Sequence, residues 1–231
     1  MSDSDANDTV EEPQNGDETP LLDEVAEALA GGRPLDLLGF ASALIDAGTR
    51  GGGLERIVDS FVDVPVRETT ALLAVLSELL DDDTLRRQCR RELDGRNDSL
   101  PQWITALDAV DVHAAQRMTH SSAEQEEILL GARLSGGGEL TCCVLVDHTL
   151  GSAVKDAFLV PAPLASVVDV ALQQNTDPET SFGEMSLADA RAGIERGIDA
   201  DSGLEDSDSW PGSRPLVLWL LRHLPSHDTA R

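Results

Sequence analysis

The sequence predicts an α+β protein, in which an N-terminal helical bundle is followed by a three- to four-stranded antiparallel meander and then by C-terminal helices. Apolar residues recur at helical spacing from residue 19 to 96, at a period of two from 110 to 160, and at helical spacing again after 164. Hydrophobic residues make up 41% of the 231-residue chain and aromatic residues only 3%. We therefore expect a substantial core of mainly aliphatic side chains.

Proline and glycine mark the first three helices. Thr19-Pro20 supplies a cap and a proline at the first helical position, and Gly31-Gly32 stops this helix. Pro34 begins a second helix, which ends at the glycine run 51–53. A third, short helix is expected from Leu54 to Phe61, where apolar residues keep helical spacing.

The next three helices differ in character. The helix after Pro65 is apolar nearly all round, so we expect it to be buried among other elements. The fifth begins at the acidic run 81–83, carries four arginines and closes at Gly95, an order that complements the helix dipole. Ser99 is expected to cap a short helix that contains Trp103.

Short apolar runs between turn residues predict the sheet. A first strand is expected from Val110 to about Met118. The meander then occupies three segments, residues 126–134, 139–147 and 152–160. Pro161-Ala162-Pro163 ends the sheet, and helical spacing returns at Leu164–Leu172, Leu187–Ile198 and Leu216–Leu224.

The two hairpins of the meander suggest a register. If residues 136–138 and 149–151 are three-residue loops, even-numbered residues share one face of the sheet. That face is apolar in all three strands: Ile128, Leu130, Ala132, Leu134, Leu140, Cys142, Val144, Val146, Val154, Phe158 and Val160. One acid interrupts it, Asp156, which this register places opposite Val144.

Asp156 is the first candidate for a functional residue. Burial among apolar side chains would raise the pKa of its carboxyl group, and such perturbed groups concentrate at functional sites. Two structural interpretations compete: Asp156 bonds a backbone amide at a bulge, or its strand is an edge and the acid reaches water. The further catalytic candidates are His148, Asp147 and Lys155. Asp147 is expected diagonally across from Lys155, where a surface ion pair would explain both, and His148 suits a turn as well as catalysis.

The net charge of −26 is unevenly distributed: the segment before Arg33 is rich in acids and has no cation, and a second acidic run covers residues 199–208. Such a chain repels phosphate, so we expect neither nucleic-acid nor anionic-membrane binding. Three interpretations remain: solubility, an acidic surface that docks a basic partner or mimics nucleic acid, and salt adaptation.

By composition and pattern the chain divides into a disordered acidic tail (1–18), a helical region (19–96), the sheet with a covering helix (97–178), and C-terminal helices with an acidic linker (179–231). Residues 19–225 are expected to form one compact unit.

Cysteine and histidine spacing predicts no metal site. The three cysteines lack zinc spacing, and Cys142 and Cys143 are expected to point to opposite faces of one strand. Pro225 breaks the helical spacing of His223 and His227.

Reduced thiols and an acidic N-terminus without an apolar signal segment favour a cytoplasmic protein. The longest apolar runs are too short to span a bilayer. No phosphate-binding loop, dinucleotide fingerprint, nucleophile elbow or zinc-protease motif occurs, so no cofactor is expected.

Several motifs resemble conserved, uncharacterised proteins of high-GC actinobacteria. Within Leu129 to Pro161 these are the L-L-G-A-R-L strand, the D-H-x-L-G turn and the V-K-D-A-F strand. Outside it, P-L-D-L-L at 34–38 and L-P-x-W at 100–103 are also similar. The resemblance covers most of the chain after residue 19, and it implies no activity and no catalytic residue.

From these observations we expect a non-enzymatic cytoplasmic protein that acts by binding another protein with a basic surface. The binding surface is expected on the sheet, or in a groove between the sheet and the N-terminal helices. The alternative is a small-ligand binder or enzyme with a site around Asp156.

Overall fold

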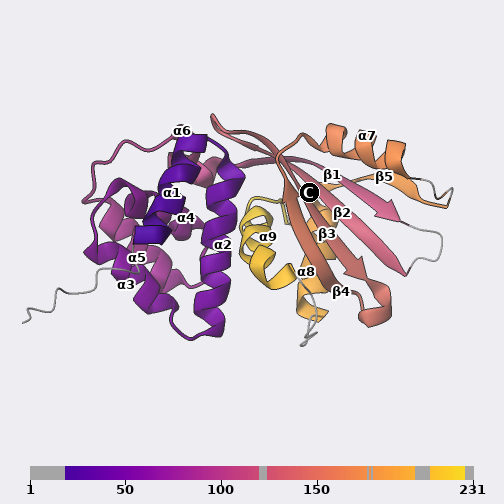
Figure 1. Ribbon diagram of the computed structural model, residues 1–231. Coiled ribbons are helices and arrows are strands. Elements are labelled where there is room, and N and C mark those ends of the chain that lie inside the picture. Colours follow the sequence, from indigo (N-terminus) through magenta and orange to yellow (C-terminus); the bar gives the residue numbers. More distant parts are fainter. Residues whose placement is uncertain (1–18, 120–123, 176, 178, 201–208, 227–231) are drawn as a thin grey trace, which may run out of the picture.

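The computed structural model describes residues 19–119, 124–175, 177, 179–200 and 209–226. This part of the chain holds nine α-helices, two short 3-10 helices and one five-stranded antiparallel sheet, which confirms the α+β class (Figure 1). The expected disordered tail and most of the second acidic run lie outside the described residues. No helix among those described is long and apolar enough to cross a membrane.

The N-terminal helices follow the punctuation of the sequence. Their bounds are α1 Thr19–Gly31, α2 Pro34–Arg50, α3 Leu54–Asp63, α4 Arg67–Leu79, α5 Asp83–Leu93 and α6 Gln102–Thr105. The helix expected to be buried is buried, since Leu72, Leu73 and Leu76 of α4 are wholly inaccessible to solvent. Asp82 caps α5 by accepting hydrogen bonds from the backbone of Thr84 and Leu85, at 2.7 and 3.0 Å.

The expected cap at Ser99 is wrong. Pro101 occupies the N-cap of α6, and the carbonyl of Ser99 instead accepts a hydrogen bond from Arg67 Nε at 3.2 Å. Ser99 lies too early to reach the first free amides of the helix. The 3-10 helix η1 (Leu107–Ala109) then leads into the sheet.

The sheet has the strand order β4-β3-β2-β1-β5. The strands are β1 Asp111–Thr119, β2 Gln125–Leu134, β3 Gly138–Asp147, β4 Ala153–Val160 and β5 Ser181–Met185. The meander of four strands is confirmed, but the sheet has a fifth strand that extends it past the expected boundary at residue 178. The segment SFGEM has neither an alternating pattern nor a run of β-formers, and only pairing with residues 115–119 of β1 makes it a strand.

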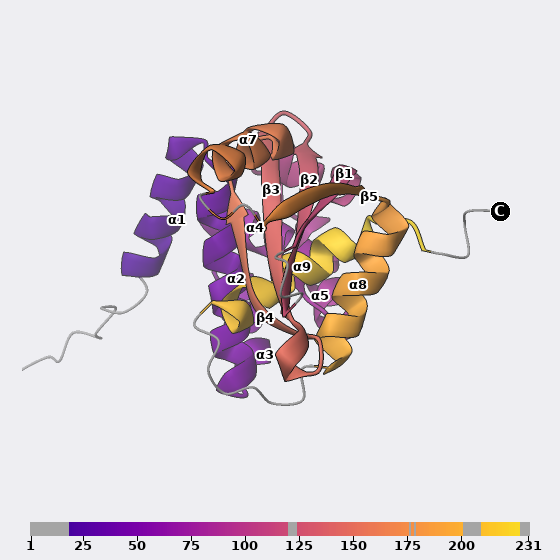
Figure 2. The ribbon, with the colours of Figure 1, turned by 90° about the vertical axis from the view of Figure 1, so that its right-hand side faces the viewer.

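Helices cover the two faces of the sheet unequally. On the inner face, α8 (Leu187–Ala200) and α9 (Trp210–Arg222) contact the strands, and on the outer face α7 (Leu164–Gln174) contacts β2 and β3 (Figures 1 and 2). α8 approaches closely because Gly193 and Gly197 face the sheet, where an added Cβ would lie 2.9 Å from Ile128 Cδ1 and from Val154 Cγ2 respectively. α9 packs between α2 and the sheet. It therefore lies in the space between the sheet and the N-terminal helices, where one of the two possible binding surfaces was expected.

α9 also begins earlier than the expected start at Leu216. Its first residue is Trp210, and Pro215 lies inside the helix. The proline has no N–H and therefore gives up one helical hydrogen bond. Burial of Trp210, which is 3% exposed, and of Pro215 itself favours the continued helix nonetheless.

The even-numbered face is confirmed for β2 and β3, where Ile128 pairs with Val144 and Leu130 with Cys142. The first hairpin loop spans residues 135–137 rather than 136–138, since Leu134 pairs with Gly138. Compared with the expected register, each strand is displaced by one residue. The two displacements add to two residues, so even-numbered residues still pair with even-numbered residues.

The register of β4 is correct at one end and wrong at the other. Val146 pairs with Val154, but Leu145 pairs with Asp156, so a β-bulge inserts Lys155 as an extra residue. Beyond the bulge the alternation reverses: Ala157 is wholly buried and Phe158 is 49% exposed. Asp156 therefore does not lie opposite Val144, and Phe158 and Val160 do not share the even-numbered inner face.

Candidate functional site

Asp156 links the edge strand β4 to the start of α9. Its Oδ1 accepts a hydrogen bond from the backbone N–H of Ala157 at 2.8 Å and another from the hydroxyl of Ser209. The Ser209 hydroxyl also lies 3.3 Å from the carbonyl oxygen of Ala157. The side chain is half-buried. These contacts match the interpretation of an acid that bonds a backbone amide at a bulge, and the carboxyl group is not isolated among apolar side chains.

Asp147 ends β3 and is the most enclosed of the four candidate residues, at 4% exposure. Its carboxylate accepts hydrogen bonds from Gln125 Nε2 at 2.8 Å and from the backbone N–H and hydroxyl of Thr149 at 2.9 and 2.5 Å. The ion pair with Lys155 is confirmed, with 3.4 Å between Nζ and Oδ2. Asp147 itself is not on the surface, because the η2 turn (His148–Leu150) folds over it.

The hydrogen bonds keep Asp147 ionised. They lower its pKa to about 2, chiefly through the Thr149 hydroxyl and then through Gln125, the Thr149 amide and Lys155, while burial acts in the opposite direction. A carboxylate held in this way is a poor general base, because it gives up its hydrogen bonds when it takes a proton. Asp147 therefore fits a structural anion that fixes the β3–β4 hairpin.

His148 begins the turn and is held by local contacts. Its backbone N–H donates to the carbonyl of Glu124 at 2.7 Å, and its ring Nδ1 lies 3.0 Å from the hydroxyl of Ser152. Nε2 is 3.9 Å from Glu126 Oε1, beyond hydrogen-bond distance. Ser152 adopts a positive φ of 67° in the same turn. Asp147, His148 and Lys155 thus gather at one hairpin, whereas Asp156 is held by Ser209.

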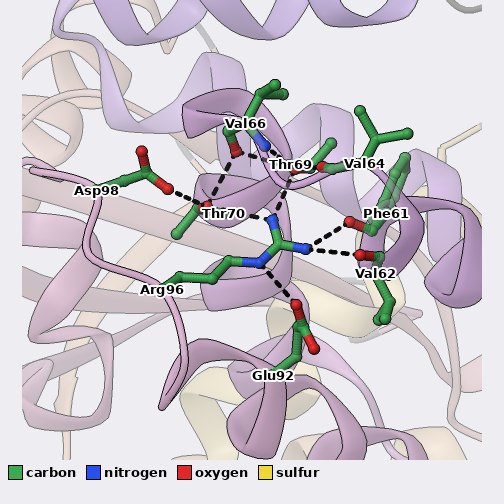
Figure 3. A network of polar contacts seen from close by, with 9 residues as sticks. All are labelled: Phe61, Val62, Val64, Val66, Thr69, Thr70, Glu92, Arg96 and Asp98. Atoms are coloured by element: carbon green, nitrogen blue, oxygen red, sulfur yellow. Dashed lines mark hydrogen bonds and ion pairs between the residues drawn. The ribbon is translucent and has the colours of Figure 1, made fainter.

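The densest polar network lies elsewhere, around Arg96, whose side chain is 5% exposed (Figure 3). Its guanidinium donates to Phe61 O and Val62 O at 2.8 and 3.1 Å, at the end of α3. It also reaches Glu92 Oε1 at 3.0 Å and the hydroxyls of Thr69 and Thr70 at 2.8 and 3.2 Å. A cation that neutralises the carbonyl end of one helix and joins it to the start of another stabilises the bundle.

Sequence reasoning missed this network. Arg96 follows the glycine that closes α5, and the only sequence signal is a threonine pair that precedes the apolar part of α4. Neither feature predicts burial of an arginine, because every one of these partners except Glu92 comes from a residue 26 to 35 positions away. Every partner is supplied by the protein, and we therefore assign Arg96 a structural role.

Surface grooves offer no single ligand class. One groove, of about 540 Å³, lies between α2, α9 and the α4–α5 turn, and one of about 410 Å³ adjoins it. Three arginines and three acids line the second groove: Arg191, Arg214, Arg222, Asp81, Glu195 and Asp199. Burial, followed by the nearby Arg86, lowers the pKa of Arg222. Another groove, about 350 Å³, borders Arg96, and a fourth of the same volume borders β5.

Among the described residues, no group of three or more His, Cys, Asp or Glu side chains could hold a metal ion. The prediction that the adjacent cysteines point to opposite faces is confirmed, since Cys142 packs in the main core and Cys143 under α7.

No family model, no curated protein and no solved structure matches the chain. The resemblance to actinobacterial proteins stays a prediction.

Proposed function

We propose that this chain is a non-enzymatic binding protein, whose outer sheet face docks a partner protein that presents apolar and basic side chains. The observation that carries the proposal is one row of residues across the outer face, one from each strand. This open row consists of Phe182, Met118, Glu127, Leu145 and Asp156, in that order. All five are half-buried.

The open row differs from its neighbours because α7 covers only part of the outer face. Leu164 and Val168 of α7 pack against Leu129 and Cys143, in the adjacent row. Leu164 also lies over the next row, since an added Cβ on Gly131 would be 2.9 Å from Leu164 Cβ. Phe158, at the edge of the covered rows, is 49% exposed. An incompletely covered apolar surface on a folded protein favours a binding role.

Charge favours a basic partner. The apolar members of the open row, Phe182, Met118 and Leu145, alternate with the acids Glu127 and Asp156. The chain as a whole carries a net charge of −26. A partner with lysine or arginine around an apolar patch gains complementary contacts here and is steered towards the surface.

Affinity capture from lysate of the source cells tests the proposal. Wild-type protein is compared with Leu145→Arg and Glu127→Arg, which change the open row, and with Leu172→Arg, a control on α7 at a side chain 52% exposed. We expect a stoichiometric partner that the wild type and the control retain and both row variants lose. Capture should also weaken as salt rises from about 50 to about 500 mM, because salt screens surface charges.

Three results would contradict the proposal. These are the absence of a stoichiometric partner, a partner that both row variants retain, and loss of capture by the control as strongly as by the row variants. Circular dichroism of each variant excludes loss of fold as the cause.

A further inference from the structure

We infer that the outer edge of β5 accepts an extended, basic segment of the partner as a sixth strand. This inference rests on the proposed function, because it names how the same partner would continue the sheet beside the open row. β5 is one end of the strand order, and its pairing partner is β1. A strand at a sheet edge directs alternate backbone N–H and C=O groups outward, where they can pair with an added chain.

The opposite edge of the sheet is blocked. On β4 the bulge at Lys155 interrupts the ladder, Asp156 accepts from the Ala157 amide, and the Ser209 hydroxyl, which donates to Asp156, lies 3.3 Å from the carbonyl oxygen of Ala157. Bulges, charges and covering segments are the usual protections against added strands. Comparable protection is missing from β5: within the described chain, no hydrogen bond from a residue outside β1 reaches Ser181 to Met185.

A groove follows β5 along its whole length. Its volume is about 350 Å³, and its lining residues are Ser181, Phe182, Gly183, Glu184, Met185, Ser186, Arg117, Thr119 and Asp189. Arg117 and Thr119 of β1 pair with Gly183 and Ser181 and share the inner face with them, so this groove lies on the α8 side of β5 and follows the strand from that face. Gly183 leaves the face of β5 uncrowded, because an added Cβ there would have nothing within 4 Å.

The charge around the groove decides between occupants. Glu184 is exposed on β5, Asp189 lies in the first turn of α8, and Arg117 is already paired with Glu126 at 3.2 Å. Pairing β5 with the same strand of a second copy would bring together two chains of net charge −26. A basic segment is attracted to this acidic edge, whereas a second acidic copy is repelled by it.

Hydrogen exchange of the full chain with a model peptide tests this inference. The probe is a peptide of alternating lysine and valine, and its counterpart with glutamate in place of lysine is the control. We expect the basic peptide to slow exchange of amides in residues 181–185, with no change in β4, and the acidic peptide to have no effect. Glu184→Lys should weaken binding of the basic peptide about tenfold, whereas Asp169→Lys, at an exposed site on α7, should leave it nearly unchanged.

Two outcomes would overturn the inference: the basic peptide protects other amides or none, or residues 181–185 become protected with rising protein concentration and no peptide, which would assign the edge to a second copy. The result is separable from the proposed function. If capture depends on Leu145 but the peptide leaves β5 unprotected, only the edge inference fails. If the peptide protects β5 while capture is independent of the open row, only the proposed outer-face docking fails.

Discussion

The inner and outer faces of the sheet are built by the same strands but are finished differently. On the inner face, Ile128, Leu130 and Val144 are fully buried beneath α8 and α9. On the outer face, α7 is the one described α-helix that packs over part of the surface, and the open row from Phe182 to Asp156 stays half-buried. The comparison teaches that burial is concentrated on the inner face, so a substitution in the open row of the outer face should cost the core little stability.

The largest expected loss of stability comes from a substitution on the inner face. Ile128→Ala should lower the free energy of unfolding by about 2–5 kcal/mol, because it leaves a cavity under α8. Met118→Ala, in the half-buried open row, should cost less than about 1 kcal/mol. Urea unfolding followed by circular dichroism measures both. Equal losses for the two variants would mean that the faces are equally buried.

A second experiment tests how tightly α7 is seated. Gly131→Ala places a methyl group 2.9 Å from Leu164 Cβ, so α7 must shift, at a cost of about 1–3 kcal/mol. Gly183→Ala is the matched control, because its methyl group meets nothing within 4 Å. Faster hydrogen exchange in residues 164–174 of the first variant only is the expected result. Unchanged hydrogen exchange in α7 would show that this helix is loosely packed and moves to make room for the methyl group.

Acid should weaken the end of the outer face near Asp147. The pKa of this carboxyl group is lowered from 3.8 to about 2 in the folded protein, so its contribution is complete above the unfolded value and is lost as the pH falls from about 4 to about 2. After allowance for solvent screening, the contribution is about 1 kcal/mol. The difference in stability between wild type and Asp147→Asn should be constant from neutral pH to about pH 5 and should shrink below pH 4. A difference that persists near pH 2 would contradict the assigned role.

The smallest effect is expected at Phe158. Its side chain is 49% exposed beside Cys143, so Phe158→Ser should change the free energy of unfolding by no more than about 0.5 kcal/mol. Chemical denaturation gives the value. A loss above about 2 kcal/mol would show that this end of the outer face is covered in solution, and would weaken the contrast between the faces.

The sequence predicted those features that depend on neighbouring residues. Pro34 and the glycines after residue 50 bound α2, Asp82 caps α5, and alternation along β2 and β3 placed Ile128 and Val144 on one face. Of the candidate site residues, the pairing of Asp147 with Lys155 followed from cross-strand geometry alone. In each case the deciding atoms lie within one turn, one strand or one hairpin.

Features that depend on distant partners were not predictable. The bulge at Lys155 reversed the face of Phe158, and the tie that holds Asp156 comes from Ser209, 53 residues away. β5 is a strand only because β1 presents an edge, and Arg96 is buried only because α3 and α4 bring carbonyls and hydroxyls to it. Local sequence fixes backbone preference and periodicity, whereas these features follow from which groups remain to be covered and hydrogen-bonded once the elements pack.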